Sequence, residues 1–221
     1  MKKLAFYNAM VILLFAGVAE SGYITLEDSG TSSTINMPFN GYWDYSWSRM
    51  IYSSDMIGHS GTISGLSFQL GDSQDYFYLS NQKIFLGHTS NDASPTTSYL
   101  DPEDNGASEV FYGSVNISGK AGDWVDFELD SDFEYNGTDN LWIIWEDRYG
   151  SSKDDSPSWR YTDTEKEVST YRAQDGSFPT ESWGAQVPYQ PNLKIDIDPV
   201  PEPATMALLG LGGLFIRRRR A

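Results

Sequence analysis

Residues 43–47 alternate aromatic and polar side chains. In a β-strand this spacing would place all three rings on one face, because successive side chains point to opposite sides. Aromatic rings stack on the apolar C–H faces of sugars, while polar neighbours bind the hydroxyls. The alternative is that the rings pack between two sheets, as most aromatic side chains do. The candidate stacking residues are Trp43, Tyr45, Trp47 and Trp159, with Trp183 as a further ring in loop-like sequence.

Residues 101–106 could bind a cation, because side-chain oxygens stand at alternate positions before a glycine. The candidate ligands are Asp101, Glu103 and Asn105. An EF-hand also needs a carboxylate at the twelfth position, and Tyr112 stands there, so the segment is not an EF-hand. An irregular calcium site is still open, with Asp154 and Asp155 as a second candidate. The alternative is that both acidic loops are simply solvated.

The sequence contains few of the residue patterns that common enzymes use for catalysis. The carboxylates Glu146 and Asp147 are adjacent, so on a strand they point to opposite faces and cannot act on one bond. The sequence contains no cysteine, no nucleophile elbow and no phosphate loop. His59 and His88 are the two histidines, and neither has a second histidine at metal-ligand spacing. We therefore expect no enzyme and no cofactor, with calcium as the one candidate ion.

The C-terminal residues combine three features in a fixed order. A Pro-Glu-Pro segment precedes thirteen uncharged residues, 204–216, and four arginines follow. A helix over 204–216 would be about 20 Å long, which is short for a membrane span of roughly 30 Å. The arginines cannot enter a protein core and fit the cytoplasmic end of a short membrane anchor. The signal residues are Val200, Pro201, Glu202, Pro203, Arg217, Arg218, Arg219 and Arg220.

This arrangement resembles the PEP-CTERM sorting signal of Gram-negative bacteria. The resemblance implies that an exosortase, an integral-membrane protease or transpeptidase, recognises the Pro-Glu-Pro segment and removes the anchor. It also implies transient attachment to the inner membrane, followed by release or attachment at the cell surface. Carriers of this signal are commonly exported proteins of strains that make extracellular polysaccharide.

The N-terminus predicts export as well. Lys2 and Lys3 precede a largely apolar stretch, 4–18, and small residues follow, which is typical of a secretory signal peptide. The sequence therefore predicts a signal peptide over 1–21, a domain over 22–198 and the sorting signal with its anchor over 199–221.

The exported part is strongly acidic. The chain has fifteen basic and thirty-one acidic residues. The predicted terminal segments hold six of the basic residues (Lys2, Lys3, Arg217–Arg220) and two acidic ones (Glu20, Glu202), which leaves nine against twenty-nine, near −20. Such a charge repels nucleic acid and anionic lipid, so we expect neither as a lasting partner.

Short apolar runs predict the fold of the domain. They are rich in β-branched and aromatic residues and are separated by Gly, Asn, Asp, Ser and Pro clusters every eight to fifteen residues, which is typical of an all-β sandwich. The expected strands are 23–27, 49–53, 62–70, 83–89, 109–117, 124–129, 140–147, 158–161, 169–172 and 192–197. No helix is expected there. A parity shift near Gly65 predicts a bulge, and loops 90–108 and 148–157 are long enough to be functional.

Segments 84–89, 133–141 and 191–195 resemble the β-sandwich (jelly-roll) modules of bacterial surface proteins. The resemblance implies an adhesive or matrix-associated role. We therefore expect an exported, non-enzymatic surface or extracellular-matrix protein whose partners are an exosortase and polysaccharide. The alternatives are a secreted glycan-active hydrolase and a purely structural surface protein.

Overall fold

The computed structural model describes residues 22–27, 30, 32–181 and 183–200, which form thirteen strands and one short helix. The all-β prediction is therefore confirmed. The predicted signal peptide over 1–21 and the anchor segment over 201–221 lie outside the described residues. No helix in the described part of the chain has the length and apolar character needed to cross a membrane.

One face of the sandwich is a four-stranded antiparallel sheet. Its strands, in spatial order, are β1 (Gly22–Leu26), β13 (Leu193–Pro199), β4 (Gly61–Gln69) and β7 (Trp124–Tyr135). The register of β4 against β7 shifts between Ile63 and Gly65, which confirms the predicted bulge. On β7, Val125, Phe127 and Leu129 are buried, as their shared parity predicts.

The other face is a six-stranded sheet, also antiparallel. Its strands, in spatial order, are β11 (Ala185–Val187), β10 (Ser169–Gln174), β3 (Tyr45–Tyr52), β8 (Asn140–Asp147), β5 (Gln74–Thr89) and β6 (Ala107–Gly119). Strand β8 lies between β3 and β5 and is buried along its whole length. An apolar run on both faces predicts this central position.

The remaining elements are short. A three-stranded sheet consists of β12 (Tyr189–Pro191), β9 (Trp159–Asp163) and β2 (Ser33–Thr34). The helix α1 (Ser54–Ile57) was not expected from the sequence. The Ser53 side chain caps it by accepting a hydrogen bond from the Met56 N–H, and Gly58 ends it with a left-handed φ of 84°.

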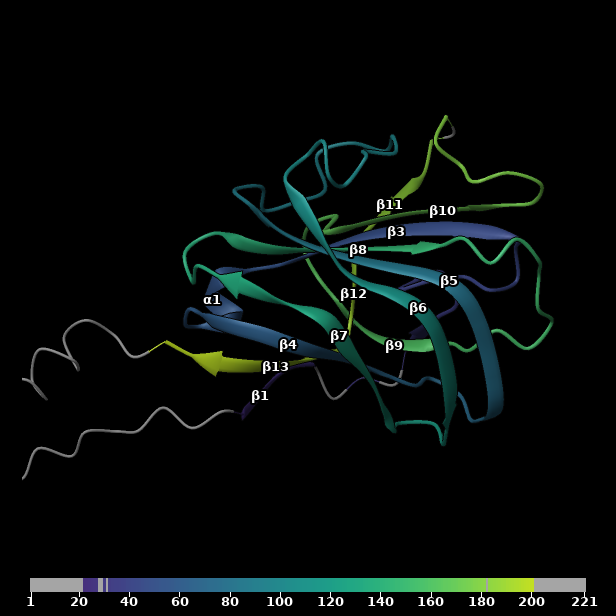
Figure 1. Ribbon diagram of the computed structural model, residues 1–221, viewed down its shortest axis with the longest axis horizontal. Helices are drawn as coiled ribbons and strands as arrows, with labels where there is room; N and C mark the ends of the chain where they lie inside the picture. Colours follow the sequence, from purple (N-terminus) through teal and green to yellow (C-terminus); the bar gives the residue numbers. More distant parts are fainter. Residues whose placement is uncertain (1–21, 28–29, 31, 182, 201–221) are drawn as a thin grey trace, which may run out of the picture. The chain divides into compact units, whose positions relative to one another are not determined.

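Figure 1 shows the two larger sheets as two layers, and the main hydrophobic core fills the space between their facing sides. Its centre is aromatic: the Phe127 and Trp145 rings lie 4.9 Å apart, and Phe39 lies 5.2 Å from Trp145 and 5.5 Å from Trp159. Edge-to-face packing of such rings adds to the stabilisation from burial alone.

A second apolar cluster lies on the outer side of the six-stranded sheet. Its buried members are Ile51, Phe85, Ala107, Trp142 and Ile144, and Leu100 packs on them. Leu100 belongs to the long segment between β5 and β6, residues 90–106. That segment therefore covers one end of the sheet's outer face.

Candidate functional site

The predicted exposed row of rings at residues 43–47 does not exist. Strand β3 begins at Tyr45, and Trp43 precedes it in a turn with 43% exposure. Trp47 is only 2% exposed, because loop residues cover it: its Nε1 donates to the Pro179 carbonyl at 2.8 Å, and the Tyr99 ring packs at 5.8 Å. Tyr45 and Trp47 share a parity on β3, but loop residues cover this face.

Trp159 also lies away from solvent. It is fully buried and packs against Phe39, Phe68 and Phe127. The prediction of a stacking role for Trp47 and Trp159 is therefore wrong for the folded domain, since a buried ring cannot reach a polysaccharide. Trp183 is 77% exposed, as loop-like sequence predicts.

The candidate calcium residues Asp101, Glu103 and Asn105 form a closed turn. Asp101 Oδ1 accepts hydrogen bonds from the N–H groups of Glu103 and Asp104, at 3.1 and 3.4 Å, and Asn105 Nδ2 donates to the Asp101 carbonyl at 2.8 Å. Gly106 follows with a left-handed φ of 82°. These hydrogen bonds, made by the side chains and backbone groups of the turn, are sufficient to hold it.

Asp154 and Asp155 are exposed in a turn of the second long loop. In the described part of the chain, no three His, Cys, Asp or Glu side chains are grouped so that they could hold a metal ion. Calcium binding by either loop stays a prediction.

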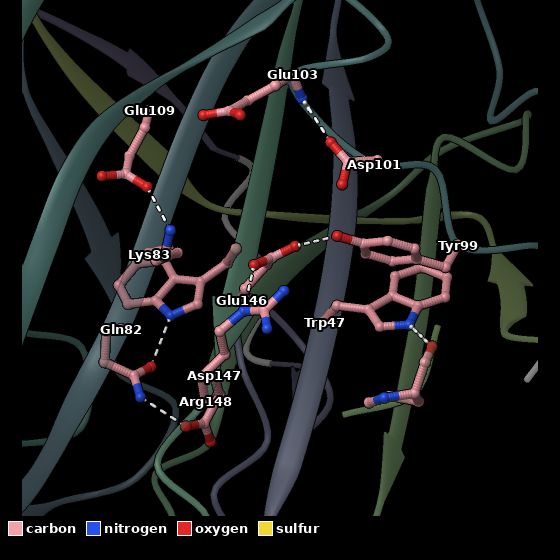
Figure 2. Close-up of polar contacts among 12 residues, drawn as sticks. Trp47, Gln82, Lys83, Tyr99, Asp101, Glu103, Glu109, Glu146, Asp147 and Arg148 are labelled. Atoms are coloured by element: carbon pink, nitrogen blue, oxygen red, sulfur yellow. Dashed lines mark hydrogen bonds and ion pairs between the residues drawn. The ribbon is translucent and has the colours of Figure 1, made fainter. Parts of the chain in front are cut away.

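Glu146 and Asp147 point to opposite sides of β8, as their adjacency predicts. Figure 2 shows Glu146 between Tyr99 and Arg148, with the Tyr99 hydroxyl donating to Oε1 at 2.5 Å and Arg148 Nε donating to Oε2 at 2.7 Å. Burial, and then the bonded carboxylate, raise the Tyr99 pKa well above its usual value. Asp147 instead accepts from Gln82 on the core side at 2.6 Å. The two carboxyl groups therefore serve separate structural networks.

Next to Glu146 on the same outer face lies the ion pair Lys83–Glu109, at 2.6 Å. Lys83 stands opposite Glu146 on one side and Tyr112 on the other. Its ammonium lies 5.3 Å from the centre of the Tyr112 ring. On the outer face of the sheet, Lys83 thus lies between the end that residues 90–106 cover and the opposite end, which is open.

The open end carries three tyrosines that the sequence analysis did not select. Tyr76 is 66% exposed, Tyr112 is 56% exposed and Tyr78 is half-buried. We call Tyr76, Tyr78 and Tyr112, with the polar residues Ser114 and Asn116 between them, the tyrosine strip.

The pairing of β5 with β6 explains how the strip forms. Phe77 and Leu79 are buried opposite Ile117 and Val115, so Tyr76 and Tyr78 point outward. Asn116 stands opposite Tyr78.

Polar contacts hold two of the three rings, Tyr78 and Tyr112, in place. The Tyr78 hydroxyl and Ser114 Oγ are 3.0 Å apart, and the Tyr112 hydroxyl donates to Asn81 Oδ1 at 3.4 Å. The Tyr112 N–H donates to Asp130 Oδ2 at 2.8 Å. The strip is therefore an outward face that combines aromatic rings with hydrogen-bonding groups.

A period-two pattern over residues 75–79 was the signal for this strip, because polar or tyrosine positions alternate with Phe77 and Leu79. The expected strand instead began at residue 83. A register shift between Leu79 and Gln82, with Asn81 at a left-handed φ of 54°, interrupts the alternation inside one continuous strand.

A groove of about 310 Å³ lies on the outer face of the four-stranded sheet, at the bulge. Gly65 forms part of its lining, together with the exposed ring of Tyr23. The acidic lining residues are Asp126, Glu128, Asp132 and Asp196. This groove would repel an anionic ligand, as would the acidic domain as a whole.

Comparison with known proteins assigns only the C-terminal end. No curated protein is significantly similar to the chain. Residues 199–220 match the PEP-CTERM protein-sorting motif, which confirms the resemblance found in the sequence and supports export and processing by an exosortase. The chain is therefore a carrier of the PEP-CTERM sorting motif, with an all-β domain in front of it.

Proposed function

We propose that the exported domain binds extracellular polysaccharide through the tyrosine strip, in a non-enzymatic surface or matrix role. The observation that carries the proposal is the outward placement of Tyr76, Tyr78 and Tyr112 beside Ser114 and Asn116. Sugar rings offer apolar C–H faces to aromatic rings and hydroxyls to polar groups, and this strip presents both on one surface. An open, exposed face of this kind suits an extended chain rather than a small molecule enclosed in a pocket.

The charges around the strip favour a neutral glycan. Lys83, the cation beside the strip, is paired with Glu109, and Asp130 is bonded at the other side. The strip itself contains no arginine or lysine that could pair with a uronate or sulfate group. A neutral polysaccharide avoids repulsion from the acidic domain, whereas an anionic polymer does not.

The test uses the exported, processed protein and measures its retention in gels that contain a neutral glucan, a neutral galactomannan or a polyuronate. We expect retention by at least one neutral polymer and none by the polyuronate. The double variant Tyr76→Ala/Tyr78→Ala should weaken retention about tenfold, or roughly 1.4 kcal/mol. Its melting temperature should stay close to wild type, since Tyr76 is exposed and Tyr78 half-buried.

Tyr23→Ala is the matched control, because Tyr23 is 63% exposed but lies on the other sheet. It should leave retention unchanged. Equal loss in this control, or no retention of the wild-type protein by any neutral polymer, would show that the strip has no such role. Release of reducing ends from a retained polymer would favour the alternative of a glycan-active hydrolase.

A further inference from the structure

Strand β13 continues into the sorting motif without a linker. Pro199 is the last residue of β13, where it pairs with Gly61 of β4, and it is also the first residue of the match to the motif. Pro201 follows only two residues later, within about 7 Å of extended chain. In the sequence, the segment that an exosortase must recognise therefore begins directly after a strand of the folded sheet.

The pairing of β13 with β4 is divided into two blocks. Leu193–Asp196 pair with residues 65–68, and the register then shifts before Ile197, Asp198 and Pro199 pair with residues 61–63. A bulge interrupts the hydrogen-bond ladder and leaves the blocks on its two sides less tightly coupled.

Within the terminal block, Ile197 is held much more firmly than the two residues after it. It pairs with Ile63 on one side and with Gly22 of β1 on the other, and it is 1% exposed. Asp198 and Pro199 pair with β4 alone among the described strands.

Asp198 is exposed, and Pro199 has no N–H with which to add to the ladder. The last two pairs are therefore the weakest part of the strand, and Ile197 is the first firm position before them.

We propose that the pairs Asp198–Thr62 and Pro199–Gly61 act as a gate for processing. The exosortase acts on the motif only after these two pairs have opened, and opening stops at Ile197. The reasoning is that an enzyme can engage a backbone segment only when that segment is free of its partner strand, so processing follows the population of the open form. The gate concerns access to the motif and is independent of polysaccharide binding.

A disulfide lock tests the gate, because the chain has no cysteine of its own. Opposed residues in an antiparallel pair have Cα atoms about 4.5–5.5 Å apart, within the range that a disulfide spans. The variant Thr62→Cys/Asp198→Cys should form the bond after export, in an oxidising compartment. We expect conversion of the full-length chain to its shorter product to slow at least tenfold in a pulse-chase experiment.

The matched control is Ser67→Cys/Lys194→Cys, which joins an opposed pair of the same two strands beyond the bulge. It should be processed at the wild-type rate, because it leaves the terminal pairs free. Inserting Gly-Ser-Gly-Ser between Pro199 and Val200 of the locked variant should restore processing, since the inserted residues supply free backbone.

Normal processing of the locked variant, with the disulfide verified by mass spectrometry, would overturn the gate. So would equal slowing in the control pair, or failure of the insertion to relieve the lock. Far-UV circular dichroism of the locked protein reports folding, and it does not depend on polysaccharide binding. Failure of the gate is therefore distinguishable from failure of the proposed function.

Discussion

Gln82 donates a 2.6 Å hydrogen bond from Nε2 to Oδ1 of Asp147, while Oδ2 of the same carboxyl group has no hydrogen-bond partner among the described residues. Asp147 is fully buried in the six-stranded sheet. Gln82 in turn accepts from the indole N–H of Trp145 at 2.9 Å. Burial raises the pKa of Asp147 to about 7, although its bonds to Gln82 and to the Tyr149 N–H act in the opposite direction.

This pKa predicts that stability falls as the pH rises. The folded state holds a proton on Asp147 up to about pH 7, whereas the unfolded chain releases it near pH 4. The contribution is therefore complete below about pH 4 and is lost as the pH rises through 7. We expect the free energy of unfolding, measured with urea, to drop by a few kcal/mol between pH 5 and pH 8.

Asp147→Asn should remove most of this slope and should be more stable than wild type at pH 8, since the amide carries no charge to bury. Asp104→Asn is the control, because Asp104 is exposed, and it should keep the wild-type slope. A slope that survives in Asp147→Asn would mean that another buried group titrates.

Gly61→Ala should destabilise the domain, because a Cβ at residue 61 would lie 2.5 Å from the Asp198 carbonyl oxygen and 2.7 Å from Ile197 Cγ1. We expect a loss on the order of 1–3 kcal/mol in urea unfolding. Gly65→Ala on the same strand is the control: its nearest contact would be an ordinary 3.4 Å to Asp196 Cβ, so the loss should be under about 1 kcal/mol. Equal losses would contradict the close approach of β13 to Gly61.

The parts of the fold that could be predicted are those that local sequence determines. Strand β8 has the predicted bounds, Asn140–Asp147, because an Asn-Gly turn precedes an apolar run and charged residues end it. Gly137 of that turn has the left-handed φ, 73°, that such turns require. The bulge beside Gly65 and the buried face of β7 follow from parity alone.

Whether one face of a strand is covered depends on segments far away in the sequence. The local sequence pattern was not sufficient to predict it. The rings of residues 43–47 alternate as strand side chains do, yet Pro179 and Tyr99, far away in sequence, cover Trp47. In the opposite case, Tyr76 and Tyr78 lie on a face that no loop among the described residues covers at that end. Tertiary packing determines which side chains are exposed, and the periodicity of the sequence carries no information about that packing.

Trp47→Ala and Trp43→Ala should differ sharply in stability. Trp47 fills a buried space and donates to the Pro179 carbonyl, so its loss leaves a cavity and an unpaired acceptor, at about 3–5 kcal/mol. Trp43 is 43% exposed, and its loss should cost under about 1 kcal/mol. Both values come from urea unfolding at one pH, and a small loss for Trp47→Ala would mean that its loop cover is not a stable part of the fold.

Arg49 fixes the long segment between β5 and β6 to the sheet. It is 2% exposed, and burial lowers its pKa to about 10, so it stays charged at neutral pH. Its guanidinium donates to Ser94 Oγ at 3.0 Å and to the carbonyls of Thr96 and Ser98. All these acceptors are neutral and lie within the segment.

Arg49→Met should therefore release this segment more than it weakens the sheet, because Met retains the buried stem and leaves the loop acceptors unpaired, at about 1–3 kcal/mol for each buried group. We expect faster amide hydrogen exchange over residues 94–100, while β8 keeps its protection. Lys120→Met, at an exposed lysine, should change neither. Uniformly faster exchange through β8 and the loop would mean instead that Arg49 supports the whole domain, since local release and global unfolding differ in how far the lost protection extends.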